Sequence, residues 1–210
     1  MIVIGICGGI GTGKTTIADI CKNLGYPVFY SDEAVAKIYE RPNIISAIAT
    51  IAPSSIIGGT VSKAVLSEIV IKDPDFLTEL ETLIHPAVCK EAASFIKKNK
   101  ARREPLAFIE APLMFISDIH TLCDYTIALT ASEKIQKSRV LQRKDMTPEK
   151  FKVLYSHQQK EMALCKQKAD FTICTNGDIL TAKQRLERIL CQIASSLEST
   201  GELRQKQKGE

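Results

Sequence analysis

Eight residues near the N-terminus have the types and spacing of a phosphate-binding loop. In order they are Gly8, Gly9, Ile10, Gly11, Thr12, Gly13, Lys14 and Thr15. An apolar run precedes them and a helical pattern follows, which is the context that the pattern Gly-x-x-x-x-Gly-Lys-Thr requires. The backbone N–H groups are expected to surround phosphate oxygens, Lys14 to reach the β- and γ-phosphates, and the Thr15 hydroxyl to ligate Mg²⁺. The loop favours binding of ATP-type phosphates over the alternative, a glycine-rich turn that holds no ligand.

Two carboxylates follow predicted strands, at the sheet edge where ligands bind in open α/β folds. Asp32 comes after a short strand at 28–30. A carboxylate there accepts the proton of an attacking hydroxyl or holds a metal-bound water, or else it is the N-cap of a helix over 33–40. Glu110 ends a strand at 106–110, where it orients Mg²⁺ through water or is simply solvated. The residues alone leave both pairs of alternatives open.

A basic segment lies in the second half of the chain. Residues 134–168 hold ten Lys and Arg against three Asp and Glu, a local charge of +7 in a chain of net charge +4. Arg139 and Arg143 are four residues apart, so both lie on one helix face, where they stabilise a transferring phosphoryl group or form a solvated face. The segment has only Phe151 and Tyr155 as aromatics, so base stacking and nucleic-acid binding are not favoured.

Histidines and cysteines form no metal or disulfide pattern. The three histidines are dispersed, and His85 beside Pro86 is either a substrate ligand or a locally satisfied side chain. The seven cysteines contain no Cys-x-x-Cys pair and follow no secretory signal, so reduced thiols in a cytoplasmic protein are expected. The apolar residues 1–7 are too few to span a membrane. No Asn-Lys-x-Asp motif follows the late strand at 171–174, which argues against a GTPase switch.

A parallel sheet is needed to bring these candidate residues together. Apolar, β-branched runs predict strands at 2–7, 28–30, 106–110, 125–129 and 171–174. Helical patterns separate them, including one after the glycine loop and one that a capping box at 130–133 opens and that runs through Arg143. This alternation predicts an α/β fold with a five-stranded parallel sheet.

Three segments fall outside the alternation. Residues 33–100 contain helical patterns without a convincing strand, so they are predicted to form a helical insertion. Within it, Asp73 and Pro74 are predicted to start a helix, and Pro86 to kink or restart it. Residues 143–168 are predicted to form a mobile basic flap. A helix is predicted over 179–199 after a turn at 176–177, with disorder from 200 to 210.

Together these motifs resemble the dephospho-CoA kinase family over residues 2 to about 193. The Gly-Gly-Ile-Gly loop combined with His-Pro and Pro-Leu-x-Phe is more specific than the phosphate-loop pattern alone. The resemblance rests on Gly8 to Thr16, Leu24-Gly25, Ser31-Asp32, Leu83-Ile84-His85-Pro86, Pro112-Leu113-Met114-Phe115, Gln136 with Arg139 and Arg143, Gln159, Ala169-Asp170 and Asn176-Gly177.

The resemblance implies a P-loop kinase core with a five-stranded parallel sheet, a helical CoA-binding insertion and a lid. The core is expected at residues 1–32, 101–142 and 169–199, the insertion at 33–100, the lid at 143–168 and a disordered tail at 200–210. The implied reaction is phosphorylation of the ribose 3′-hydroxyl of dephospho-CoA by ATP with Mg²⁺, the final step of coenzyme A biosynthesis. No nucleic-acid or membrane partner is implied, and the expected state is a cytoplasmic monomer, with an oligomer as the alternative.

The resemblance also implies roles for particular residues. Asp32 matches the general base, and Lys14, Arg139 and Arg143 join it as catalytic residues. The acceptor is expected to contact Asp32, His85, Pro112 and Leu113. The nucleotide is expected to contact Gly9, Ile10, Gly11, Thr12, Gly13, Lys14, Thr15, Thr16, Asn176 and Gly177, with Mg²⁺ held through ATP and Thr15.

Four positions depart from the usual pattern of the family. Tyr30 stands where the first of two aspartates is usual, and Ile116 where a glutamate follows the Pro-Leu-x-Phe motif. Lys63 stands where the insertion often has an arginine, so it keeps the charge but loses the two-pronged fork. Cys165 replaces a basic residue of the lid. None of the four lies in the phosphate loop or at Asp32, so phosphoryl transfer is expected to survive.

Two other functions remain as alternatives. One is a kinase of the same fold that acts on another small hydroxyl compound or a nucleoside monophosphate. The other, from a different class, is a regulatory protein that binds ATP without transferring phosphate. Asp32 and the arginine pair argue against the regulatory protein, because binding alone does not need them.

Overall fold

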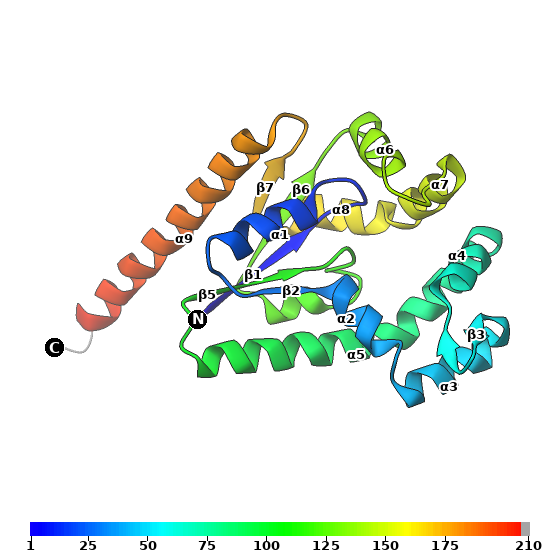
Figure 1. The fold of residues 1–210 in the computed structure, drawn as a ribbon. Helices are drawn as coiled ribbons and strands as arrows, with labels where there is room; N and C mark the ends of the chain where they lie inside the picture. The colour runs from blue at the N-terminus through cyan, green and yellow to red at the C-terminus, as the bar shows by residue number, and fades with distance from the viewer. Residues whose placement is uncertain (207–210) are drawn as a thin grey trace.

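The apolar run before the glycine loop forms the central strand of a five-stranded parallel sheet. This strand, β1 (Ile2–Cys7), lies between β5 (Leu106–Glu110) and β6 (Tyr125–Thr130), while β2 (Val28–Tyr30) and β7 (Phe171–Cys174) form the edges (Figure 1). All neighbouring strands run parallel. The structure is a computed structural model that describes residues 1–206 of the 210-residue chain. It confirms the five predicted strands and the α/β fold.

Helices connect the strands and cover both faces of the sheet (Figure 1). In chain order they are α1 (Lys14–Asn23), α2 (Ser31–Ile38), α3 (Pro42–Ile51), α4 (Lys63–Lys72), α5 (Pro74–Ala101), α6 (Glu133–Leu141), α7 (Pro148–His157), α8 (Gln159–Lys168) and α9 (Ile179–Lys206). Two short 3₁₀ turns lie at Pro53–Ser55 and Ile119–Leu122.

Alternating side chains of β1 divide the core into two layers. Ile4 and Ile6 pack with α1 and α9 on one face. Val3 and Cys7 pack on the other face, with α5 and the insertion. Between them a Cβ added at Gly5 would lie 2.4 Å from the Met114 Sδ, so a larger residue there would force the Met114 side chain to move. Both faces of the central strand are buried, which explains why its sequence is a continuous apolar run.

The insertion contains a short hairpin that the sequence did not predict. β3 (Ile56–Ile57) pairs antiparallel with β4 (Thr60–Val61), so the expectation that 33–100 lacks strands is wrong. Gly58 and Gly59 supply the turn with φ values of 57° and 78°. Two residues per strand are too few to give an alternating pattern.

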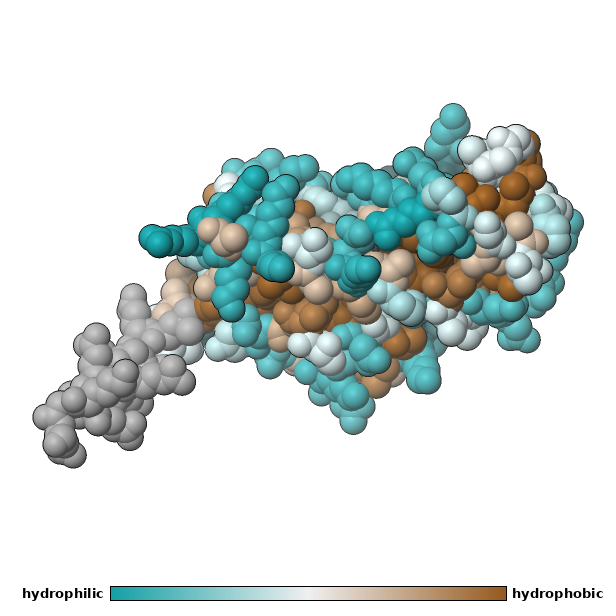
Figure 2. Space-filling model, turned by 90° about the horizontal axis from the view of Figure 1, so that it is seen from below, coloured by the Kyte–Doolittle hydropathy of each residue, from teal (hydrophilic) through white to brown (hydrophobic). Residues whose placement is uncertain are grey.

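Figure 2, seen from the side of α5, shows a prominent apolar patch at the end of the molecule that the insertion forms.

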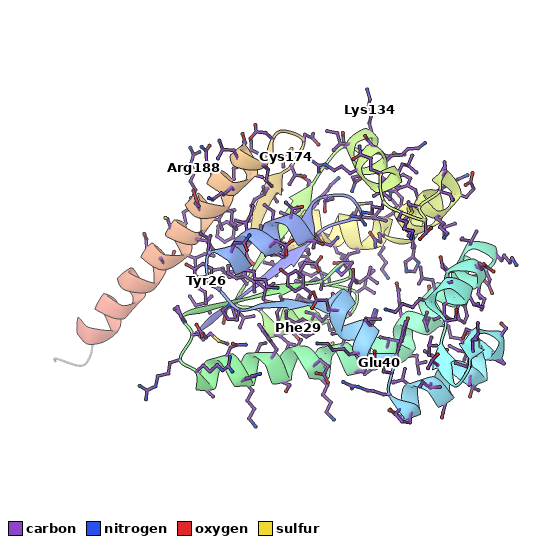
Figure 3. The ribbon with its side chains drawn as sticks, in the orientation of Figure 1. Tyr26, Phe29, Glu40, Lys134, Cys174 and Arg188 are labelled. Atoms are coloured by element: carbon purple, nitrogen blue, oxygen red, sulfur yellow. The ribbon has the colours of Figure 1, made fainter. Side chains whose placement is uncertain are left out.

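One long helix of the insertion, α5, lies under the sheet (Figure 1). α5 begins as predicted, because the Asp73 side chain accepts a hydrogen bond from the Asp75 N–H at 3.2 Å. It continues through Pro86 as a single helix of 28 residues, so the predicted restart is wrong. Packing against the sheet stabilises α5. For example, Phe29 of β2 points towards α5, and the centroid of the Phe29 ring lies 5.7 Å from that of the Phe95 ring (Figure 3).

The basic segment after β6 folds into helices. α6 begins at Glu133 with Ser132 as the N-cap and ends at Leu141, so the capping box at 130–133 and the extension to Arg143 are wrong. Thr130 still belongs to β6, where it pairs with Cys174, so it cannot cap a helix. The predicted flap consists of α7 and α8, and Lys134 of α6 projects away from the body (Figure 3). The mobility of the flap at residues 143–168 stays a prediction.

The last helix is longer than the sequence predicted. α9 packs against the sheet through buried side chains as far as Ile193 and continues through Lys206, extending away from the sheet (Figure 1). The disorder expected from residue 200 is therefore not found at 200–206, where residues such as Leu, Arg, Gln and Lys favour helix. Residues 207–210 lie outside the described part of the chain. Within residues 1–206, no helix is both long and apolar enough to cross a membrane.

Candidate active site

The glycine loop has backbone geometry that only glycine supplies easily. Gly8, Gly11 and Gly13 have φ values of 139°, 76° and 89°, a region that other residues avoid. A Cβ at Gly8 would lie 2.4 Å from the Leu129 carbonyl oxygen, and one at Gly11 would lie 2.7 Å from the Gln136 carbonyl oxygen. The loop ends where Gly13 becomes the N-cap of α1. The structure therefore confirms the predicted strand–loop–helix context of a phosphate-binding loop.

Lys14 lies buried inside the loop. Its Nζ donates to the Gly9 carbonyl oxygen at 3.1 Å, and the Thr12 hydroxyl donates to the same oxygen at 2.8 Å. Burial lowers the pKa of Lys14, whereas the charges of Glu110 and Asp32 raise it. The ammonium group is thus held in the loop with two carboxylates close enough to affect its ionisation.

Glu110 is one of these carboxylates, and its solvated reading is wrong because only 3% of the residue is exposed. It ends β5 between Ile6 of β1 and Tyr30 of β2. The Ser31 hydroxyl donates to its backbone carbonyl oxygen at 2.9 Å, which ties the ends of two strands together. Burial raises the pKa of the Glu110 side chain to about 7, with Lys14 opposing that shift. Glu110 therefore lies within electrostatic reach of the loop.

Asp32 is the second of the two carboxylates near Lys14, and it also borders a cavity. It is the second residue of α2, whose N-cap is Tyr30, so the reading of Asp32 as an N-cap is wrong. Its charge opposes the effect of burial, which lowers the pKa of Lys14, and adds to the effect of burial, which raises the pKa of Glu110. It also lines a cavity of about 270 Å³ between α2, α5 and the segment after β5. Asp32 thus lines this cavity and lies close enough to the phosphate loop for its charge to act on Lys14.

The 270 Å³ cavity brings together the four residues predicted to contact an acceptor. His85, Pro112 and Leu113 line it together with Asp32. Burial lowers the pKa of His85. Much of the rest of the lining is apolar and comes from the buried face of α5. A mostly apolar cavity with one carboxylate near the phosphate loop fits an organic acceptor that presents a hydroxyl group.

A second cavity of about 560 Å³ lies on the other side of the loop. Gly11, Gly13, Thr16, Arg139, Arg143 and Gly177 line it, together with residues of α9. Predicted nucleotide-contacting residues and both predicted catalytic arginines therefore meet at one cavity.

Two predicted residues of the nucleotide site make other contacts. The Arg139 guanidinium donates to the carbonyl oxygens of Gly11 and Thr175 at 3.3 and 2.6 Å, so it also joins the loop to the segment after β7. Asn176 does not line the cavity; its side-chain oxygen accepts from the Ser132 N–H at 2.8 Å, at the start of α6. Thr15 is exposed in the first turn of α1.

Three of the four positions that depart from the family pattern have hydrogen-bond partners, and the fourth, Lys63, is exposed at the start of α4. The Tyr30 hydroxyl donates to the Asp19 carboxylate at 2.6 Å. Glu161 of α8 is fully buried and accepts the N–H of Ile116 at 2.9 Å. The Cys165 thiol donates to the same carboxylate at 3.3 Å, and its pKa is raised by its contact with Cys7. The contacts of Ile116 and Cys165 thus hold α8 against the segment after β5 and against β1.

Sequence reasoning missed several residues around the acceptor cavity. Glu81 and Gln158 line it, His157 contacts Glu81, and Glu161 anchors its wall. They are ordinary polar residues in helices or at a helix junction, and their partners are distant in sequence. No local pattern distinguishes them from solvated side chains.

Comparisons with known proteins agree on one family. The family model described as dephospho-CoA kinase matches residues 2–181. A dephospho-CoA kinase from Rhodopseudomonas palustris (strain HaA2) is 32% identical over 190 residues, which cover 90% of this chain and 94% of that protein. A solved protein from Thermus thermophilus is 27% identical with a TM-score of 0.69, covering 91% of this chain and 97% of that chain. A solved dephospho-CoA kinase from Campylobacter jejuni, 19% identical, has the same fold with a TM-score of 0.65, covering 92% and 98%.

Proposed function

The chain belongs to the dephospho-CoA kinase family, and from that premise we propose how its residues carry out the reaction. It is an ATP-dependent phosphotransferase, and it converts dephospho-CoA to coenzyme A in the final step of coenzyme A biosynthesis. We assign the donor to the core at residues 1–32, 101–142 and 169–199, and the acceptor to the insertion at 33–100. Residues 143–168 act as the lid.

The position of Asp32 carries this proposal. Asp32 lines the acceptor cavity and influences the ionisation of Lys14 in the phosphate loop. A carboxylate between the two sites can accept the proton of the ribose 3′-hydroxyl as that oxygen bonds to the γ-phosphorus. The bond from the γ-phosphorus to ADP breaks in the same transfer. Asp32 is therefore the proposed general base.

Charge on the transferring group is the second requirement of the reaction. The backbone N–H groups of residues 9–14 and the Lys14 ammonium face the phosphates in this class of loop. Arg139 and Arg143 line the adjoining cavity, and both lie near the loop. Preorganised positive groups stabilise the equatorial oxygens of the transition state. Gly177 and Thr16 complete the nucleotide side of the site.

The oxygen donors of the site fit Mg²⁺. The Thr15 hydroxyl follows Lys14, and Glu110 and Asp32 bring carboxylates close to the same ammonium group. Among residues 1–206, no three acidic, His or Cys side chains gather into a metal cage. Such a cage is not expected, because Mg²⁺ usually combines few protein oxygens with phosphates and water. When bound, the ion neutralises charge on the β- and γ-phosphates.

Replacing Asp32 tests its role. Asp32→Asn keeps the shape of the side chain but cannot take a proton, so kcat should fall on the order of 10²-fold or more. The affinity for ATP should stay unchanged, as measured by equilibrium binding. Glu33→Gln is the matched control, because Glu33 is an exposed acid in the same first turn of α2. An unchanged kcat in Asp32→Asn would assign the base to another group.

A further inference from the structure

The junction between α7 and α8 contacts both the acceptor cavity and the phosphate loop. We propose that His157 and Gln158, the adjacent residues at this junction, are positioning residues that hold the acceptor against the phosphate loop. The inference rests on the proposed function and names positioning residues of that same site.

His157 contacts the acceptor side. Its Nε2 lies 2.8 Å from the Glu81 Oε2, and this contact joins the end of α7 to the middle of α5 across 76 residues of sequence. Glu81 lines the acceptor cavity beside His85. The two side chains of the pair are 18% and 20% exposed, so solvent screens the pair less than a surface ion pair. Burial raises the pKa of Glu81, and the contact with His157 opposes that shift.

Gln158 contacts the donor side. Its Oε1 accepts the N–H of Ile10 at 2.6 Å, within the phosphate loop. Gln158 also lines the acceptor cavity, so the same side chain borders both sites. Neighbouring residues are only about 3.8 Å apart along the chain. A displacement of the acceptor wall at Glu81 is therefore transmitted to the loop through a single peptide unit.

A third contact, made by Glu161 in the first turn of α8, fixes this junction to the opposite wall of the cavity. The buried Glu161 carboxylate accepts the N–H groups of Phe115 and Ile116 at 3.0 and 2.9 Å. These residues follow Pro112 and Leu113, which line the cavity. The start of α8 thus holds one wall, His157 holds the other, and Gln158 holds the loop between them.

This arrangement predicts which kinetic constant changes. Loss of the His157–Glu81 contact frees one wall of the acceptor cavity but leaves the 560 Å³ nucleotide cavity intact, because neither residue lines it. The affinity for the acceptor should therefore fall while the affinity for ATP stays constant. A purely structural role would alter both constants or only the melting temperature.

The experiment measures steady-state kinetics with dephospho-CoA and ATP varied separately. His157→Ala should raise KM for dephospho-CoA about tenfold, the size expected for a hydrogen bond to a charged group, with KM for ATP within about twofold. Glu81→Gln should do the same, and the double variant should be no worse than either single variant. His157→Gln keeps an N–H donor near the Nε2 position and should restore most of the acceptor affinity.

Two further variants complete the test. Gln158→Ala should lower kcat several-fold at saturating substrates, because the loop loses its contact at Ile10. Glu91→Gln is the matched control, because Glu91 lies on α5 like Glu81 but lines neither cavity. The change breaks the ion pair between Glu91 and Arg41. It should leave both KM values unchanged.

The outcomes separate this inference from the proposed function. Wild-type protein that forms no coenzyme A would overturn the proposed function and this inference with it. Active wild-type protein whose KM for dephospho-CoA is unchanged in both His157→Ala and Glu81→Gln would overturn the inference alone. Equal increases of both KM values in His157→Ala would also overturn it. Melting temperatures close to wild type in the single variants support a positioning role.

Discussion

Burial opposes the ionised forms of charged residues in this site. Burial raises the pKa of the Glu110 carboxyl to about 7 and lowers that of the Lys14 ammonium. In the proposed reaction, the Glu110 carboxylate and the Lys14 ammonium act in their charged forms beside Mg²⁺ and the phosphates. The free protein therefore keeps a charged cluster that favours function at some cost in stability.

Glu110→Gln should make the nucleotide-free protein more stable at alkaline pH. The pKa of Glu110 rises from 4.5 to about 7 on folding, so between these values the folded state binds more protons than the unfolded state. Stability then falls as pH rises through this window, and the loss is complete above about pH 7. The variant lacks this loss, so at pH 8 it should be about 1–3 kcal/mol more stable than wild type.

Urea unfolding at pH 5 and pH 8 measures the effect. The difference between the variant and wild type should be larger at pH 8, and kcat of the variant should be lower than that of wild type. A difference in stability that does not depend on pH would show that Glu110 does not titrate in this window. Glu104→Gln, in the loop before β5, provides a comparison with a carboxylate outside the site.

Single residues differ in how well the sequence predicts them. Asp32 and Glu110 follow strands, and the carboxyl ends of parallel strands share one edge, so their proximity to the loop could be predicted. The His157–Glu81 contact joins residues 76 positions apart in two helices. Nothing in either local pattern indicates the partner, because helix packing alone decides which polar side chains meet.

At the scale of elements, α5 continues through a proline that usually breaks a helix. Pro86 lacks an N–H, and its ring crowds the carbonyl group of Thr82. The helix persists because Ile84, Val88 and Ala92 are buried on the face that packs against the sheet. Tertiary packing therefore outweighs the local preference at this position.

Pro86→Ala should stabilise the protein by about 1–3 kcal/mol, because alanine restores a helix hydrogen bond and removes the clash. Pro86 is exposed, so the change leaves no cavity in the core. Urea unfolding measures the gain. Lys90→Ala, at an exposed position of the same helix, should change stability by less than about 0.5 kcal/mol. If Pro86→Ala is no more stable than wild type, the helix carries no strain at residue 86.

The elements themselves were predictable where burial produces a long pattern. The five strands of the sheet were found because they are apolar runs of buried residues. The hairpin of β3 and β4 was missed because each strand has only two residues. The start of α6 was misplaced because Thr130 fits a capping box in sequence while its backbone is held in β6.

For the whole molecule, parallel topology brings the phosphate-binding loop and two carboxylates to one edge of the sheet. The order β2-β5-β1-β6-β7 places the loop after β1 beside the ends of β5 and β2, where Glu110 and Asp32 lie. The sequence predicted this convergence through its strand–helix alternation. It did not predict how α7 docks on the insertion or how α8 docks on the segment after β5, because these contacts depend on packing between distant segments.

The most direct test of this account is an acceptor assay. Purified protein is mixed with MgATP and, in separate reactions, with dephospho-CoA, a nucleoside monophosphate or shikimate. ADP formation is followed over time, and the products are identified by mass. We predict rapid ADP formation only with dephospho-CoA, together with a product of the mass of coenzyme A that carries the new phosphate on the ribose 3′-oxygen. ADP formation that is no faster with dephospho-CoA than without it would contradict the account.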